Sequence, residues 1–259
     1  MKAKTELLLY RLLWLAEKPM NKPYHNLEQS FEGWAYRNGL LNQIHQLERQ
    51  GWLESRHDPA SGKRLHRLTE AGRNLVLDGR DPEKSWSRDW DRKWRLFLFD
   101  IPESQRSMRR QLNRTLAKAG CGCLQGSVWI APCTPQQIEK LVESDDPDCT
   151  HLLMLHADSK GLKVDAKMVE GAWDFEKINT AHRALQTILD RYPDVVRSYS
   201  REALAVWTAE ENAATRAFLQ IDPLLPSVLL PKGYEAKKIW KKRRTILGRA
   251  ARLAASLAE

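Results

Sequence analysis

The chain has 259 residues, of which 42% are hydrophobic and 29% are charged, and its formal net charge is +9. This length suits two or three small domains, and the composition excludes a chain that is disordered throughout. The positive charge favours a polyanionic partner, such as nucleic acid or an acidic membrane surface.

The first residues resemble the start of a secretion signal, because Lys2 and Lys4 precede a run of leucines. Arg11 interrupts that run, and no small-residue cleavage site follows it. No apolar run approaches the roughly 20 residues that span a bilayer. We therefore expect a cytoplasmic protein without membrane association, in which the cysteines are free thiols.

The first 80 residues carry the pattern of a winged helix-turn-helix. Apolar spacing and turn residues predict three helices, a two-stranded wing and a fourth helix. The expected ranges are helices at 5–17, 27–35 and 38–50, strands at 52–56 and 65–68, and a helix from Thr69 to Leu77. Gly51 is the expected C′ residue of the third helix. We assign residues 1–80 to a DNA-binding domain of this type.

The third of these helices has the composition of a recognition helix. Its apolar side is formed by Leu40, Leu41, Ile44 and Leu47, and amides and an arginine lie elsewhere on its surface. Asn and Gln pair bidentately with adenine, and Arg contacts guanine or phosphate. The candidate DNA-binding residues are Arg37, Asn38, Asn42, Gln43, Gln46 and Arg49 around this helix, and Arg56, Lys63 and Arg64 on the wing.

Other interpretations of this domain stay open. Each basic wing residue could be an ordinary solvated charge, and a winged helix can also bind another protein. Residues 1–88 hold 15 Lys or Arg against 11 Asp or Glu, which is a modest net charge of +4. Because contacts at two half-sites multiply the affinity, we expect a homodimer on a double-stranded operator.

A linker and a second domain follow. Residues 81–93 are polar and are expected to form a linker, or a helix with no apolar face of its own. Residues 94–164 alternate strands, expected at 94–100, 124–131 and 152–155, with two helices between them. The first helix carries Met108, Leu112 and Leu116, and the second begins at Thr134 and ends near Val142. This order predicts a small ferredoxin-like α+β domain.

Residues 165–259 have a helical pattern and are expected to form a C-terminal helical domain. The expected helices are 172–192, 209–220 and 234–257, separated by Pro193 and by the block 222–226. The last helix carries eight Lys or Arg between residues 237 and 252. A solvated face is the default interpretation, and contacts to DNA phosphates, to an effector's phosphates or to a membrane are alternatives. The fold class is therefore α+β.

Four stretches of the sequence resemble the PaaX family of bacterial repressors. They are Leu47–Leu53 with Leu68–Gly72, Trp94–Glu103 with Arg106, Arg109 and Arg110, Gly126–Pro132, and Gly171–Asp174 with 222–226 and 229–231. The resemblance implies a dimeric repressor of aromatic catabolism. In the known case, phenylacetyl-coenzyme A releases the repressor from its operator, so the resemblance implies a small aromatic or acyl-coenzyme A effector.

Ten tryptophans are many for a chain of this length. Aromatic residues at such positions are usually core, and this is the first interpretation. The alternative is an aromatic wall for the effector, formed by Trp94, Trp129 and Trp173.

Asp100 ends the first strand of the middle domain. This strand and the residues after it are similar to the metal-binding strand of small CRISPR-associated nucleases. A metal-dependent nuclease is thus the alternative function, but one carboxylate is a poor Mg²⁺ site and a cap suffices. Zinc is a weak alternative, since Cys121, Cys123, Cys133 and the Cys149-Thr-His151 stretch lack paired-knuckle spacing. No serine triad, phosphate loop or dinucleotide fingerprint is present, so we expect no enzyme activity, catalytic residue, metal or cofactor.

Overall fold

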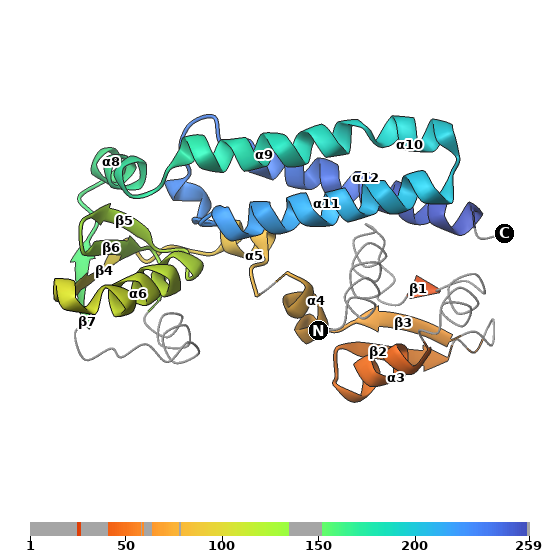
Figure 1. Ribbon diagram of the computed structural model, residues 1–259, viewed down its shortest axis with the longest axis horizontal. Helices are drawn as coiled ribbons and strands as arrows, with labels where there is room; N and C mark the ends of the chain where they lie inside the picture. The colour runs from red at the N-terminus through yellow and green to blue at the C-terminus, as the bar shows by residue number, and fades with distance from the viewer. Residues whose placement is uncertain are drawn as a thin grey trace. The chain divides into compact units, whose positions relative to one another are not determined.

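A computed structural model describes residues 25–26, 41–57, 59, 64–77, 79–134 and 152–257 (Figure 1). The chain divides into two compact units. One comprises Met1–Arg80, His182–Ala217 and Glu235–Glu259, and the other comprises Asp81–Ala181 and Phe218–Tyr234. The predicted helices at 5–17 and 27–35 lie outside the described residues, as does most of the turn between the two wing strands.

The N-terminal segment contains a short helix, a hairpin and a second helix. Its elements are β1 (His25–Asn26), α3 (Leu41–Arg49), β2 (Leu53–His57), β3 (Arg64–Leu68) and α4 (Glu70–Val76). The strands form an antiparallel sheet in the order β1-β3-β2. The helix, hairpin and helix predicted for residues 38–77 are therefore present.

Local capping explains where these helices begin and end. Gly51 has a φ of +69°, and Trp52 N donates to Leu47 O while Gly51 N donates to Glu48 O. This is a Schellman motif, and it confirms Gly51 as the C′ residue of α3. Thr69 caps α4, since its Oγ1 accepts from Gly72 N at 3.0 Å.

Gly72 allows α4 to pack tightly on the end of the hairpin. A Cβ atom at this position would lie 2.1 Å from Trp52 O, which is a backbone atom that cannot move aside easily. The close approach therefore requires glycine.

The middle sheet has the ferredoxin-like strand order. Its elements are β4 (Lys93–Phe99), a 3₁₀ turn (Glu103–Gln105), α6 (Arg106–Lys118), β5 (Gly122–Gln125), β6 (Val128–Ala131) and β7 (Leu152–Asp158). The order β5-β6-β4-β7 is antiparallel throughout, with Phe97 opposite both Trp129 and Met154. The predicted ferredoxin-like fold of this region is confirmed.

One strand prediction was wrong in detail. Residues 124–131 form a hairpin of two strands, β5 and β6, rather than one strand. Gly126 has a φ of +52° and turns the chain between them. The predicted helix that begins at Thr134 lies almost wholly outside the described residues.

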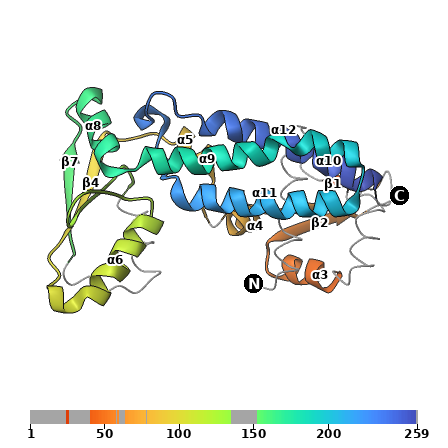
Figure 2. The same ribbon diagram turned by 45° about the horizontal axis from the view of Figure 1, so that its top comes forward.

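Both faces of this sheet are covered by apolar residues. On one face, Phe97 and Phe99 pack with Leu112 and Leu116 of α6. On the other face, Trp94 and Ile130 belong to a second cluster, which also holds Val169, Trp173, Ile178, Leu225 and Leu229. Figure 2 shows α6 and α8 (Leu162–Ala172) beside the sheet.

The segment predicted as a linker contains a short packed helix, α5 (Pro82–Ser87). Asp81 caps it by accepting from Glu83 N at 3.0 Å. Trp86 on this helix is 5% exposed, and its Nε1 donates to Tyr234 Oη at 3.1 Å. The polar composition of the segment concealed two buried residues of this helix, Pro82 and Trp86, so the expectation of a helix without an apolar face was wrong.

The C-terminal part is helical, as predicted. Its α-helices after Trp173 are α9 (Phe175–Asp190), α10 (Tyr192–Ser198), α11 (Arg201–Ile221) and α12 (Ala236–Ser256). A 3₁₀ turn spans Ser227–Leu229. The predicted helix 172–192 is interrupted at Trp173, and Asp174 caps α9 by accepting from Lys177 N at 3.0 Å. Helix α11 begins eight residues earlier than the predicted Ala209.

A buried ion pair joins α11 to α12. Arg243 and Glu211 are both 0% exposed, and Arg243 Nε donates to Glu211 Oε1 at 2.7 Å. Thr215 Oγ1 lies 2.8 Å from the same carboxylate oxygen, and the guanidinium lies 4.6 Å from the centre of the Trp240 ring. Arg243 is therefore a core residue rather than part of the basic surface of α12.

Among the described helices, none is long and apolar enough to cross a bilayer.

Candidate nucleic-acid interface

One side of α3 carries exposed polar residues, and the opposite side is buried. Four exposed residues follow the i, i+3, i+4, i+7 spacing of a single helix face. We call this set the α3 stripe: Asn42, His45, Gln46 and Arg49. Ile44 and Leu47 on the other side are 2% and 0% exposed, so packing fixes which side faces outward.

Glu48, the single acid of α3, is held by the hairpin. Ser55 Oγ on β2 donates to Glu48 Oε1 and lies 2.7 Å from Nδ1 of the buried His66 on β3. Glu48 Oε2 lies 3.4 Å from His45 Nδ1. This network ties α3 to both strands of the hairpin. Glu48, Ser55 and His66 come from three different elements, so no local pattern in the sequence indicates their contact.

The basic residues of the wing differ in their surroundings. Arg56 on β2 is exposed. Arg67 on β3 pairs with Glu54 directly across the hairpin, with Nη2 and Oε2 at 2.5 Å. Arg64 begins β3, and Lys63 lies outside the described residues.

The remaining candidate DNA-binding residues are not all placed on the α3 stripe. Gln43 is half-buried and lies beside it. Arg37 and Asn38 lie outside the described residues. The structure therefore brings together Asn42, Gln46 and Arg49 of the predicted set.

The three tryptophans proposed as an aromatic wall lie in the core. Trp94 and Trp173 share one cluster, with ring centroids 6.4 Å apart, whereas Trp129 belongs to the cluster on the opposite face of the sheet. They are 1%, 8% and 8% exposed. Trp94 Nε1 also donates to the buried Asp165 at 2.8 Å. The three rings thus do not form one surface.

Asp100 is exposed just beyond β4. In the described part of the chain, there is no group of three or more His, Cys, Asp or Glu side chains that could hold a metal ion. Cys149 and His151 of the zinc alternative lie outside that part. The observed surroundings of Asp100 do not favour a metal-dependent nuclease.

Comparison with known proteins found a family match for the middle of the chain. Residues 87–169 match the family model described as the PaaX protein central Cas2-like domain. This part of the chain is similar to the central domain of PaaX proteins. A solved structure, that of the uncharacterized protein Rv0674 from Mycobacterium tuberculosis, is similar over 97% of both chains, with 19% identity and a TM-score of 0.51, which shows the fold. No curated protein matches the chain in sequence.

The residues that resembled the PaaX signatures have structural roles. Trp173 Nε1 donates to Gly120 O at 3.3 Å, and a Cβ atom on Gly122 would lie 2.6 Å from the Trp173 ring. Asp222 is 0% exposed and accepts from Tyr234 Oη at 2.6 Å. Burial and the Asp222 carboxylate raise the pKa of Tyr234 well above its usual value. Trp173 and Asp222 therefore have packing and hydrogen-bonding roles in the interior.

Proposed function

We propose that this protein is a DNA-binding transcription regulator that acts as a dimeric repressor. The similarity of residues 87–169 to the central domain of PaaX proteins favours a role in transcription regulation. The observation that carries the proposal is the α3 stripe, where Asn42, Gln46 and Arg49 are exposed opposite a buried apolar side. These are the side-chain types that read adenine and guanine edges in the major groove.

The elements around α3 support a winged helix-turn-helix in residues 1–80. A helix, a two-stranded hairpin and a second helix follow one another, as this motif requires. The network of Glu48, Ser55 and His66 would keep α3 and the hairpin in one geometry. The exposed Arg56 would then contact the phosphate backbone while α3 lies in the groove.

The edge of the middle sheet supports a homodimer. β7 is an edge strand of the described sheet, and Leu153, Met154 and Leu155 on it are 56%, 37% and 45% exposed. The strand has no Lys, Arg, Asp or Glu before Asp158, so it lacks the charges that usually guard an edge. A second copy is the proposed occupant, because antiparallel edge pairing is self-complementary about a two-fold axis. Two copies would also supply two DNA-binding heads.

Control by a small aromatic or acyl-coenzyme A effector completes the proposal. An effector releases DNA only if it binds more tightly to the conformation with low DNA affinity. The protein would have no enzymatic activity, and it would act in the cytoplasm, where its operator is accessible.

Binding selection from fragmented genomic DNA, followed by footprinting, tests the proposal. The full chain is expected to enrich a short sequence with two half-sites. The Asn42→Ala, Gln46→Ala double variant should lose the sequence preference while it stays folded. Gln125→Ala with Gln220→Ala is the matched control, since both amides are exposed outside residues 1–80. Failure of the wild-type protein to enrich any sequence would refute the proposal.

A further inference from the structure

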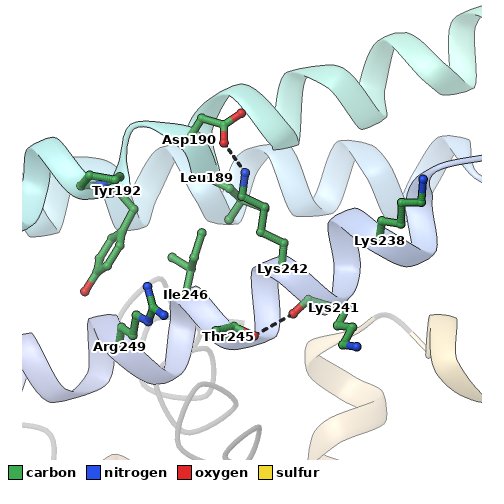
Figure 3. Close-up of a pocket in the computed structure, with 10 residues that line it drawn as sticks. Leu189, Asp190, Tyr192, Lys238, Lys241, Lys242, Thr245, Ile246 and Arg249 are labelled. Carbon is green, nitrogen blue, oxygen red and sulfur yellow. Dashed lines mark hydrogen bonds and ion pairs between the residues drawn. The ribbon is translucent and has the colours of Figure 1, made fainter.

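A pocket lies between the α9–α10 junction and one face of α12 (Figure 3). Its volume is about 570 Å³, which is in the range of small-molecule sites. From the α9–α10 junction it is lined by Leu189, Asp190, Tyr192 and Pro193. All the lining residues belong to one compact unit.

The α12 side of the pocket is a continuous helical face. Its lining residues have the spacing i, i+3, i+4, i+7, i+8, i+11: Lys238, Lys241, Lys242, Thr245, Ile246 and Arg249. The core side of α12, with Trp240, Arg243 and Leu247, points away from this face. The cations therefore follow the pocket over three turns of helix, and they do not surround the helix evenly.

The floor of the pocket is apolar and firmly supported. Leu189, Tyr192 and Ile246 are 0%, 4% and 7% exposed. The Tyr192 ring packs against Trp207 with a centroid distance of 5.0 Å, and Trp207 Nε1 donates to Ile188 O at 2.9 Å. Because these rings are already fixed, a ligand would find a preformed apolar surface.

The rim of the pocket carries more positive charge than its own acids neutralise. Lys242 is paired with Asp190, and Lys238 Nζ lies 3.8 Å from Glu235 Oε1 with both side chains largely exposed. Among the described residues, Lys241 and Arg249 have no carboxylate partner within ion-pair distance. Two cations are thus available at the mouth of an apolar pocket.

We propose that this pocket binds an organic anion, a molecule with an apolar group and a phosphate, sulfonate or carboxylate. The apolar group contacts Tyr192, Pro193 and Ile246. The acidic group pairs with Lys241 and Arg249 at the rim, through charge-assisted hydrogen bonds. The further assignment of this ligand as the effector that controls DNA binding rests on the proposed regulator function.

Calorimetric titration of the full chain with 1-naphthyl phosphate tests the site. This probe combines an aromatic ring with a dianion, and 1-naphthol and inorganic phosphate supply each half alone. We expect the complete probe to bind at least tenfold more tightly than either half. Lys241→Gln with Arg249→Gln should weaken binding of the complete probe at least tenfold and leave the weak binding of 1-naphthol unchanged.

A matched control removes two positive charges outside the pocket. Lys232→Gln with Lys237→Gln changes two exposed cations and should leave the affinity for 1-naphthyl phosphate within twofold of wild type. Circular dichroism verifies that both double variants keep their helices. The proposal is overturned if the two double variants lose affinity equally, or if the wild-type protein does not bind the complete probe below a millimolar dissociation constant.

A parallel titration with selected DNA separates this site from the proposed function. The Lys241→Gln, Arg249→Gln variant should bind DNA like wild type when no probe is present. An equal loss of DNA and probe affinity would assign these cations to DNA phosphates and would overturn the small-molecule site. If the wild-type protein binds the probe and no DNA sequence at all, the regulator function fails while the pocket assignment stands.

Discussion

Removal of the Glu211 carboxylate is expected to destabilise the α11–α12 packing strongly. Glu211 and Arg243 are both 0% exposed, and the carboxylate accepts from Arg243 Nε at 2.7 Å. Glu211→Ala would leave a guanidinium buried without its counter-charge, which costs about 3–5 kcal/mol. Since 1 kcal/mol shifts the melting midpoint of a domain of this size by about 2–4 °C, the midpoint should fall by about 6–20 °C.

A surface ion pair between α9 and α12 provides the control. Lys242 and Asp190 form an ion pair with side chains 41% and 52% exposed. Asp190→Ala should therefore cost less than about 1 kcal/mol. Both variants are compared by thermal melting, followed by far-ultraviolet circular dichroism, which reports helix content.

The double variant Glu211→Leu, Arg243→Met separates loss of charge pairing from loss of packing. Apolar residues of similar size often replace a buried pair at little cost, so this variant should recover most of the midpoint lost in Glu211→Ala. A midpoint shift in Glu211→Ala no larger than that in Asp190→Ala would show that the buried ion pair contributes little to stability.

Three further predictions concern other parts of the molecule. Leu155→Glu should convert the dimer to a monomer, as measured by light scattering. Leu162→Glu, which changes an exposed leucine on α8, should leave the dimer intact. A dimer that persists in both variants would contradict the β7 interface. Arg56→Ala should weaken binding to all DNA sequences alike and reduce the salt slope by about 1, and a change in sequence preference instead would contradict a phosphate contact. Burial raises the pKa of Cys133 to about 11, so its thiol stays protonated at neutral pH. Alkylation by iodoacetamide, followed by mass spectrometry, should be slow at pH 8 and accelerate as the pH approaches that pKa; fast alkylation at pH 8 would contradict this.

Elements with local signals could be predicted from the sequence. The spacing of Ile44 and Leu47 predicted α3, and Gly51 predicted where this helix ends. The apolar run from Trp94 gave β4, because a strand buried on both faces needs apolar residues at successive positions. The hairpin of β5 and β6 was missed, since its strands have only four residues each.

The features that depend on distant residues could not be predicted in this way. Arg243 looks like one more cation on a basic helix, and only its contact with Glu211, 32 positions away, makes it a core residue. The pocket beside α12 likewise forms because Tyr192 and Arg249 come together from separate helices. Of the candidate site, the α3 residues followed from periodicity, whereas the fixed position of Glu48 required the contacts of the hairpin.

Photo-crosslinking from α3 to DNA tests whether this helix lies in the groove of the operator. A benzophenone side chain is introduced in place of Gln46 on the α3 stripe, and in place of the exposed Gln125 as the control. With the selected DNA bound, we expect a crosslink from position 46 to bases inside a half-site and none from position 125. A crosslink from position 125 but not from position 46 would contradict the assignment of α3 as the recognition helix.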